Sequence, residues 1–194
     1  LGVVPRDAVA AIRQSAHADA ELVARAGEIE RRTHHDVIAF TEKGSSVSKG
    51  ETLVDTARNI EAMGVDIIVI RHASAGAAQV LARACRSSIV NAGDGAHEHP
   101  TQGLLDLYTI RQEFARLGKK LDGAHVALAG DLKHGRTVHS LIKLLSLYRG
   151  LHFSLVAPAS LEMPGELVEL ARARGHRVRE AATLKDGVRR PNIL

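Results

Sequence analysis

Aromatic residues are scarce in this sequence. Among 194 residues there is no Trp, and there are only two Tyr and three Phe. Proteins that bind nucleic acid usually combine a basic stripe with aromatic side chains on which the bases stack. The sequence contains 26 Lys and Arg and 22 Asp and Glu, and the basic residues are scattered along the chain. We therefore expect no nucleic-acid partner, and a small anionic substrate is the better use for local positive charge.

Cysteine and long apolar runs are also lacking. The single cysteine, Cys85, excludes an internal disulfide and a zinc site made of several thiolates, which fits a cytoplasmic protein. No apolar run approaches the roughly 18 residues of a membrane span, so we expect no membrane partner. The first residues lack a basic segment followed by an apolar one, so no signal peptide is expected. Since the sequence does not begin with Met, we expect the natural start to lie upstream.

Short β-branched runs alternate with longer amphipathic segments from residue 61 onward. Strands are predicted over 66–70, 88–92, 125–129, 153–157 and 176–179. Helices are predicted over 51–63, 75–85, 101–117, 137–148 and 164–173. This alternation is typical of an α/β fold, in which helices flank parallel sheets. In such folds ligands bind beyond the carboxyl ends of the strands.

The first 43 residues show no strand pattern. Apolar residues at near-helical spacing predict helices over 5–26 and 28–41, and a Gly- and Ser-rich loop follows at 43–50. We therefore expect a helical N-terminal arm over 1–43.

Two basic side chains stand where an anion could bind. The loop over 45–50 contains Lys49, and backbone N–H groups, hydroxyls and an ammonium suit a phosphate, although a solvated linker is the alternative. Arg71 directly follows the predicted strand 66–70, so it points into the expected crevice unless it is an ordinary surface residue.

Two further loops join a predicted strand to a helix. In the first, His99 precedes Pro100 near a helix start, and Gln102 lies one turn on. The neighbouring His97 and Glu98 could indicate a metal site, but no third strong ligand stands at a suitable spacing, so we expect no metal. Donation by a histidine to a carbonyl oxygen is the more natural use. In the second loop, Arg136 offers a guanidinium for a carboxylate or phosphate.

Five segments together resemble the catalytic chain of aspartate carbamoyltransferase. They lie in order at 45–53, 69–72, 91–95, 99–102 and 130–140, and include His-Pro-Thr-Gln and Gly-Asp-Leu-Lys-His-Gly-Arg. The resemblance covers residues 44–187. It implies a partial carbamoyl phosphate-binding domain at 44–120 and a partial aspartate-binding domain at 121–194. It also implies a transferase of pyrimidine biosynthesis that transfers a carbamoyl group from carbamoyl phosphate to L-aspartate without a cofactor.

The resemblance assigns carbamoyl phosphate to one group of residues. Arg71 would hold its phosphate and carbonyl groups, His99 its carbonyl oxygen and Gln102 its amino group, with Ser45 as a further contact.

Arg136 would bind a carboxylate of aspartate, and Lys49 would reach into the site of a neighbouring subunit, which implies a homo-oligomer, a trimer in the family. Within this site, His99, Lys49 and Arg71 would be the catalytic residues. The reaction needs no covalent intermediate, so catalysis would consist of positioning and charge stabilisation.

The chain departs from the family pattern at both ends. The Ser-Thr-Arg-Thr-Arg phosphate-binding motif is absent before the serine loop, and neither the Arg-x-Gln aspartate-binding motif nor the Pro-Leu loop follows residue 187. Two functions therefore stay open. One is carbamoyl transfer, which this fragment would perform poorly or not at all, and the other is a non-catalytic module that binds phosphate or carbamoyl phosphate.

Residues 1–42 resemble a different family, adenylosuccinate lyase. The matching stretches are 5–8, 28–30 and 33–40, in which a His-Asp-Val triplet would supply a substrate-binding histidine, His35. The two resemblances meet near Lys43. The sequence leaves open whether the chain is a natural fusion, an engineered chimera or a fragment, and a lyase fragment is the weakest function because the lyase's catalytic loop is missing.

Overall fold

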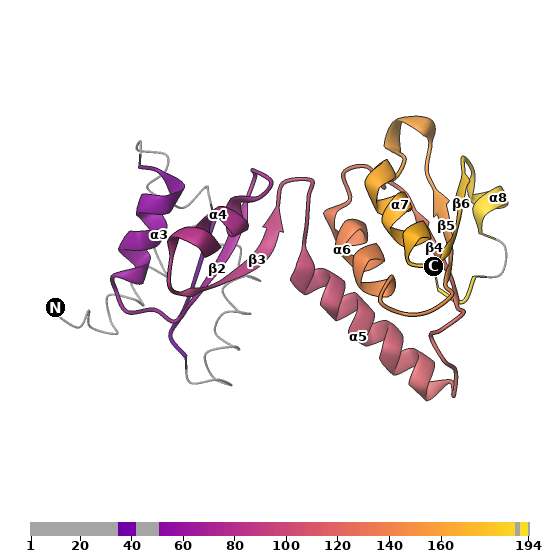
Figure 1. The fold of residues 1–194 in the computed structure, drawn as a ribbon, viewed down its shortest axis with the longest axis horizontal. Helices are drawn as coiled ribbons and strands as arrows, with labels where there is room; N and C mark the ends of the chain where they lie inside the picture. Colours follow the sequence, from indigo (N-terminus) through magenta and orange to yellow (C-terminus); the bar gives the residue numbers. More distant parts are fainter. Residues whose placement is uncertain (1–34, 42–50, 189–190, 194) are drawn as a thin grey trace. The chain divides into compact units, whose positions relative to one another are not determined.

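The computed structural model describes residues 35–41, 51–188 and 191–193 of the chain (Figure 1). The chain divides into two compact units, Leu1–Gly95 and Ala96–Leu194. Both contain a parallel sheet covered by helices, which confirms the predicted α/β class. None of the helices in the described ranges has the length and apolar character that a membrane span requires.

The first unit contains three strands and two helices. In chain order these are β1 (Val37–Thr41), α3 (Leu53–Glu61), β2 (Ile67–His72), α4 (Ala77–Ala84) and β3 (Ser88–Asp94). The sheet has the order β1-β2-β3, and each neighbouring pair is parallel. Pairing of Val37 with Ile67, and of Ile67 with Ser88, sets the register. All three strands therefore end at the same edge, where Arg71 lies.

Strand β1 corrects the prediction of a helix over 28–41 and, at these residues, of a helical arm over 1–43. Ile38 and Phe40 pack with α3 and α4, whereas Val37 and Ala39 pack on the opposite face of the sheet. This alternation is that of a strand covered on both sides. A run of four apolar residues fits either a strand or a buried helix. Pairing with β2, a contact across 30 residues of sequence, decides between the two.

The second unit carries most of the predicted loops. Its elements are α5 (Pro100–Arg116), β4 (His125–Ala129), α6 (Arg136–Leu145), β5 (His152–Val156), the 3-10 helix η3 (Ala159–Leu161), α7 (Gly165–Ala173), β6 (Arg177–Ala181) and α8 (Leu184–Gly187). The strands form a parallel sheet of order β4-β5-β6. Phe153 at the centre of the sheet packs in one core with Phe114 of α5, Ile142 of α6 and Leu167 of α7.

The edge of β4 that does not pair with β5 forms hydrogen bonds with Asn192 and Ile193. Ile193 forms a parallel bridge with Val126, and its carbonyl accepts a hydrogen bond from the Ala127 N–H at 2.9 Å. The Asn192 N–H donates to the His125 carbonyl at 2.8 Å, and the Asn192 side chain accepts from the His125 N–H.

The two units meet in sequence between Gly95 and Ala96. The boundary predicted from the sequence lies further along the chain, between residues 120 and 121. Helix α5 belongs to the second unit, whereas the predicted boundary put it in the first domain. As functional domains, 44–120 and 121–194 stay a prediction.

Helices α5 and α6 approach closely at Gly103. A Cβ at this position would lie 2.9 Å from Ser140 Cβ and 3.1 Å from Leu144 Cδ1. We therefore expect Gly103→Val to lower the free energy of unfolding by about 2 kcal/mol, because a branched side chain forces the helices apart. Urea unfolding measures the change. The control is Gly165→Ala in α7, where no atom lies within 4 Å of the new Cβ, and equal losses in both variants would contradict the close approach.

Candidate functional site

The predicted site residues are divided between the two units. Arg71 is half-buried near the end of β2 in the first unit, whereas His99, Gln102 and Arg136 belong to the second. The predicted convergence of Arg71 with His99 and Gln102 therefore stays a prediction. The other two, Ser45 and Lys49, lie outside the described residues.

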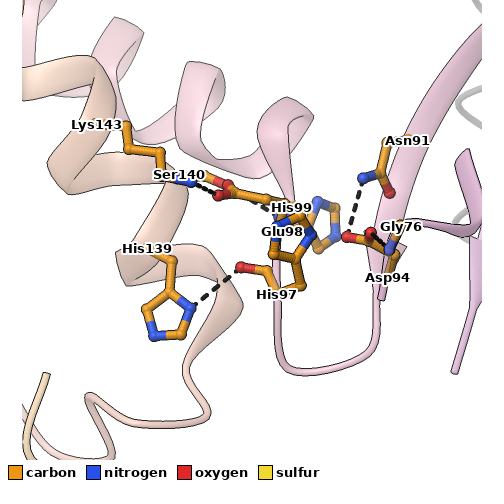
Figure 2. Close-up of polar contacts among 9 residues, drawn as sticks. All are labelled: Gly76, Asn91, Asp94, His97, Glu98, His99, His139, Ser140 and Lys143. Carbon is orange, nitrogen blue, oxygen red and sulfur yellow. Dashed lines mark hydrogen bonds and ion pairs between the residues drawn. The ribbon is translucent and has the colours of Figure 1, made fainter. Parts of the chain in front are cut away.

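A buried carboxylate organises the strand ends beside Arg71. Asp94, the last residue of β3, is 2% exposed; its Oδ2 accepts from the Gly76 N–H at 2.6 Å and its Oδ1 from the Asn91 amide at 3.0 Å (Figure 2). The next residue, Gly95, donates its N–H to the His72 carbonyl at 2.9 Å. These bonds tie the end of β3 to the end of β2 and to the start of α4. In the sequence analysis Asp94 is only part of the 91–95 segment and is not predicted as a site residue.

His99 caps the N-terminus of α5. Its Nδ1 accepts from the Gln102 N–H at 3.4 Å and lies 3.2 Å from the Thr101 hydroxyl, and Pro100 occupies the first helical position. When Nδ1 accepts, a neutral imidazole carries its hydrogen on Nε2. The cap therefore makes Nε2 a hydrogen-bond donor, which is what the binding of a carbonyl oxygen requires.

The Gln102 side chain is also oriented. Its Nε2 donates to Asp106 Oδ1 at 2.8 Å, one turn further along α5. With the amide nitrogen directed along the helix, the amide oxygen is the group that can accept from a substrate N–H. His99 and Gln102 thus offer a donor and an acceptor at the start of one helix.

The carboxylate of Glu98 is occupied by protein contacts. It accepts from the Ser140 hydroxyl and pairs with the Lys143 ammonium (Figure 2). Ser140 Oγ in turn accepts from the His99 N–H at 2.9 Å. Within the described parts of the chain no three His, Cys, Asp or Glu side chains are grouped as metal ligands would be. Glu98 therefore fastens the His99 segment to α6, a role that no sequence motif indicated.

Arg136 is the first residue of α6, and a tight loop precedes it. Asp131 Oδ1 accepts from the backbone N–H groups of His134 at 2.9 Å and Lys133 at 3.2 Å. The His134 N–H is the main cause of the lowered pKa of the Asp131 carboxyl. At Gly135 a Cβ would lie 2.5 Å from the Asp131 carbonyl oxygen, so only glycine fits. The loop thereby fixes the backbone position from which the Arg136 side chain extends.

At the opposite end of the first sheet, Glu61 accepts hydrogen bonds from the turn before β3. The Ser87 N–H donates to its Oε1 at 2.7 Å, the Ser87 hydroxyl donates at 3.1 Å, and the Arg86 N–H also donates. The Ser87 N–H is the largest cause of the lowered pKa of Glu61.

This pKa shift predicts an acid-dependent contribution to stability. A carboxyl with a lowered folded-state pKa stabilises the protein above its unfolded-state pKa, and the contribution is lost as pH falls through the folded-state pKa. We expect Glu61→Gln to be less stable than the parent at neutral pH, with the difference shrinking in acid. Urea unfolding between about pH 7 and pH 3 measures it. The exposed Glu162→Gln serves as control, and a difference that is constant with pH would contradict the role of the charge.

Comparison with known proteins gives a consistent result. A family model described as "Aspartate/ornithine carbamoyltransferase, carbamoyl-P binding domain" matches residues 10–112. The aspartate carbamoyltransferase catalytic subunit of Dichelobacter nodosus is 50% identical over 159 residues, which are 82% of this chain and 45% of that protein. Its counterpart from Methanocaldococcus jannaschii is 45% identical over 157 residues, 80% of this chain and 50% of that protein. The chain thus spans about half the length of these relatives.

Solved structures agree. Aspartate transcarbamoylase from Trypanosoma cruzi in complex with carbamoyl aspartate and phosphate is 38% identical, with a TM-score of 0.73, covering 88% of this chain and 54% of that one. The same enzyme in complex with N-(phosphonacetyl)-L-aspartic acid gives a TM-score of 0.74 at 37% identity, covering 88% of this chain and 53% of that one.

The family match also bears on the N-terminal segment. It begins at residue 10 and includes most of 1–42, so these comparisons do not support the predicted resemblance to adenylosuccinate lyase. His35, the residue assigned from that resemblance, is exposed two residues before β1. The match extends over more than half of the 194 residues. The chain therefore belongs to the aspartate/ornithine carbamoyltransferase family.

Proposed function

We propose that this chain carries the carbamoyl phosphate-binding half of an aspartate carbamoyltransferase and part of its aspartate site. The observation that carries the proposal is the start of α5, where His99 Nδ1 accepts from the Gln102 N–H, so that a neutral ring carries its hydrogen on Nε2. A carbonyl oxygen and an amino group are the complements of the His99 ring and the Gln102 amide. Carbamoyl phosphate bears both on one carbon atom.

The reaction follows from these groups. The amine of aspartate attacks the carbonyl carbon, a C–N bond forms, and the C–O bond to phosphate breaks as phosphate leaves with the bonding electron pair. The amine loses a proton in the process, and the departing phosphate takes it up. Donation from His99 stabilises the negative charge that develops on the carbonyl oxygen, and the Arg71 guanidinium would hold the departing phosphate. The remaining contribution is the alignment of the two reactants.

The second substrate is assigned to the other loop. Arg136 would hold one carboxylate of aspartate through the fork of its guanidinium, from a loop fixed by Asp131 and Gly135. Lys49 and Ser45 complete the proposal on grounds of family resemblance. If Lys49 reaches a neighbouring subunit, the working protein is a homo-oligomer, and a trimer is the family's arrangement. We also propose that it works in the cytoplasm.

A second function is favoured by one observation. The matched family model describes the carbamoyl-P binding domain. Binding of carbamoyl phosphate without turnover is therefore the alternative.

Two measurements on the 194-residue protein distinguish these functions. Calorimetric titration with carbamoyl phosphate tests binding, and a colorimetric assay for carbamoyl aspartate tests transfer. Binding with turnover supports the transferase, and binding alone supports the module. Absence of binding, with the protein shown to be folded by circular dichroism, would overturn both.

A further inference from the structure

His139 is a buried histidine whose two ring nitrogens both face backbone carbonyl oxygens. The side chain is the fourth residue of α6, and the residue is 4% exposed. Its Nε2 lies 2.8 Å from the Leu132 carbonyl oxygen. Its Nδ1 lies 3.1 Å from the His97 carbonyl oxygen, the contact drawn in Figure 2. A neutral imidazole carries a hydrogen on one nitrogen only, so its two tautomers donate either to the Leu132 carbonyl or to the His97 carbonyl. One side chain therefore contacts two segments that are 35 residues apart in the sequence.

Each of these segments leads into a residue of the proposed site. His97 stands two residues before His99, the cap of α5. Leu132 is 1% exposed and lies in the loop that ends at Arg136. Leu132 is itself fixed, because its N–H donates to the Leu161 carbonyl at 3.1 Å. His139 thus joins the loop before the aspartate-binding arginine to the segment before the carbamoyl phosphate-binding histidine.

A second buried histidine in the same unit shows what a purely structural contact looks like. His176 is 5% exposed; its Nδ1 accepts from the Leu151 N–H at 3.1 Å and its Nε2 lies 3.2 Å from the Ser146 carbonyl oxygen. Its partners lie at the C-terminal end of α6 and at the start of β5, away from His99 and Arg136 in the sequence. The two histidines match in burial and in having two backbone partners, and they differ in which segments these partners belong to.

We propose that His139 is a positioning residue that fixes His99 relative to Arg136 through its contacts with the His97 and Leu132 carbonyls. This inference rests on the proposed function for the roles of His99 and Arg136. Because the imidazole is rigid, the separation of the two carbonyls is set by the ring. A misplaced His99 donor would weaken carbamoyl phosphate binding without removing any group that contacts it.

Two amide variants separate the contacts. Asn places its side-chain nitrogen where the histidine has Nδ1, so His139→Asn can still donate to the His97 carbonyl. Gln places its nitrogen where the histidine has Nε2, so His139→Gln can still donate to the Leu132 carbonyl. His176→Gln is the matched control, since it perturbs an equally buried ring away from the proposed site. All three are made in the 194-residue chain.

Three readouts are compared across the variants: thermal unfolding, amide hydrogen exchange and calorimetric titration with carbamoyl phosphate. We expect His139→Gln to lose exchange protection over 96–103 and to bind carbamoyl phosphate about tenfold more weakly, the effect of one buried hydrogen bond. His139→Asn should keep the exchange protection over 96–103 and the affinity for carbamoyl phosphate, and should lose exchange protection over 130–136 instead. His176→Gln should lower the unfolding temperature with unchanged affinity.

Two results would overturn the inference. One is equal loss of affinity in His139→Gln and His176→Gln, and the other is unchanged exchange over 96–103 in His139→Gln. If the parent chain binds no carbamoyl phosphate, the proposed function fails. The exchange pattern then still decides whether His139 positions the two segments.

Discussion

Replacement of Arg71 by methionine is expected to weaken carbamoyl phosphate binding by about 10²-fold. Methionine keeps the length and much of the volume of the side chain but removes the guanidinium, the group that would hold the phosphate with charge-assisted hydrogen bonds. Arg71 stands at the carboxyl end of β2, where ligands of parallel sheets bind. Calorimetric titration of the variant and the parent measures the ratio of dissociation constants.

Arg83→Met is the control for this loss. Arg83 is exposed on α4 in the same unit, so its replacement removes the same charge at a position that the proposal leaves outside the site. Its affinity should equal that of the parent. If both variants bind equally well, Arg71 is an ordinary surface residue and the carbamoyl phosphate assignment fails at this position.

Asp94→Ala is expected to have the largest effect on stability, a loss of about 3 kcal/mol in the free energy of unfolding. The carboxylate is 2% exposed and accepts from the Gly76 N–H and the Asn91 amide. Alanine leaves both donors without this partner, and each charge-assisted bond is worth about 1.5–3 kcal/mol. Urea unfolding followed by circular dichroism gives the difference.

Two further variants define what Asp94 does. Asp94→Asn keeps the shape and one acceptor oxygen, so it should recover part of the loss. Gln79→Ala, a truncation of an exposed side chain on α4, should change stability by no more than about 0.5 kcal/mol. Equal stability of Asp94→Ala and the parent would show that the strand ends are held by other contacts.

The local signals in the sequence located most of the fold. Strand β4 lies at the predicted 125–129, and the predicted 66–70 and 88–92 differ from β2 and β3 by one or two residues at their ends. Here apolar runs, glycines and amphipathic segments alternate within a few residues. β1 was missed because its conformation depends on pairing with β2, a contact that no local pattern contains.

The candidate site likewise contains residues that the local sequence indicated and residues that only the structure shows. His99 and its Pro-Thr-Gln sequence indicated a helix cap, and α5 begins there. Asp94, Ser140 and His139 were not predicted as site residues, because their partners are backbone groups or distant side chains: Gly76 is 18 residues from Asp94, and His97 is 42 residues from His139. A sequence motif indicates groups that can act on a ligand, whereas the residues that support them are recognised only when the chain is folded.

The short bridge at Ile193 has a consequence for solubility. Strand β4 reads His-Val-Ala-Leu-Ala, and β5 pairs with one of its two edges. An uncovered edge of such an apolar strand is a template onto which a second molecule can add a strand. Asn192 and Ile193 occupy this edge with backbone hydrogen bonds to His125 and Ala127. A shortened chain that ends before residue 191 would therefore lose the contact of Ile193 with the core and expose this edge of β4 to edge-to-edge aggregation.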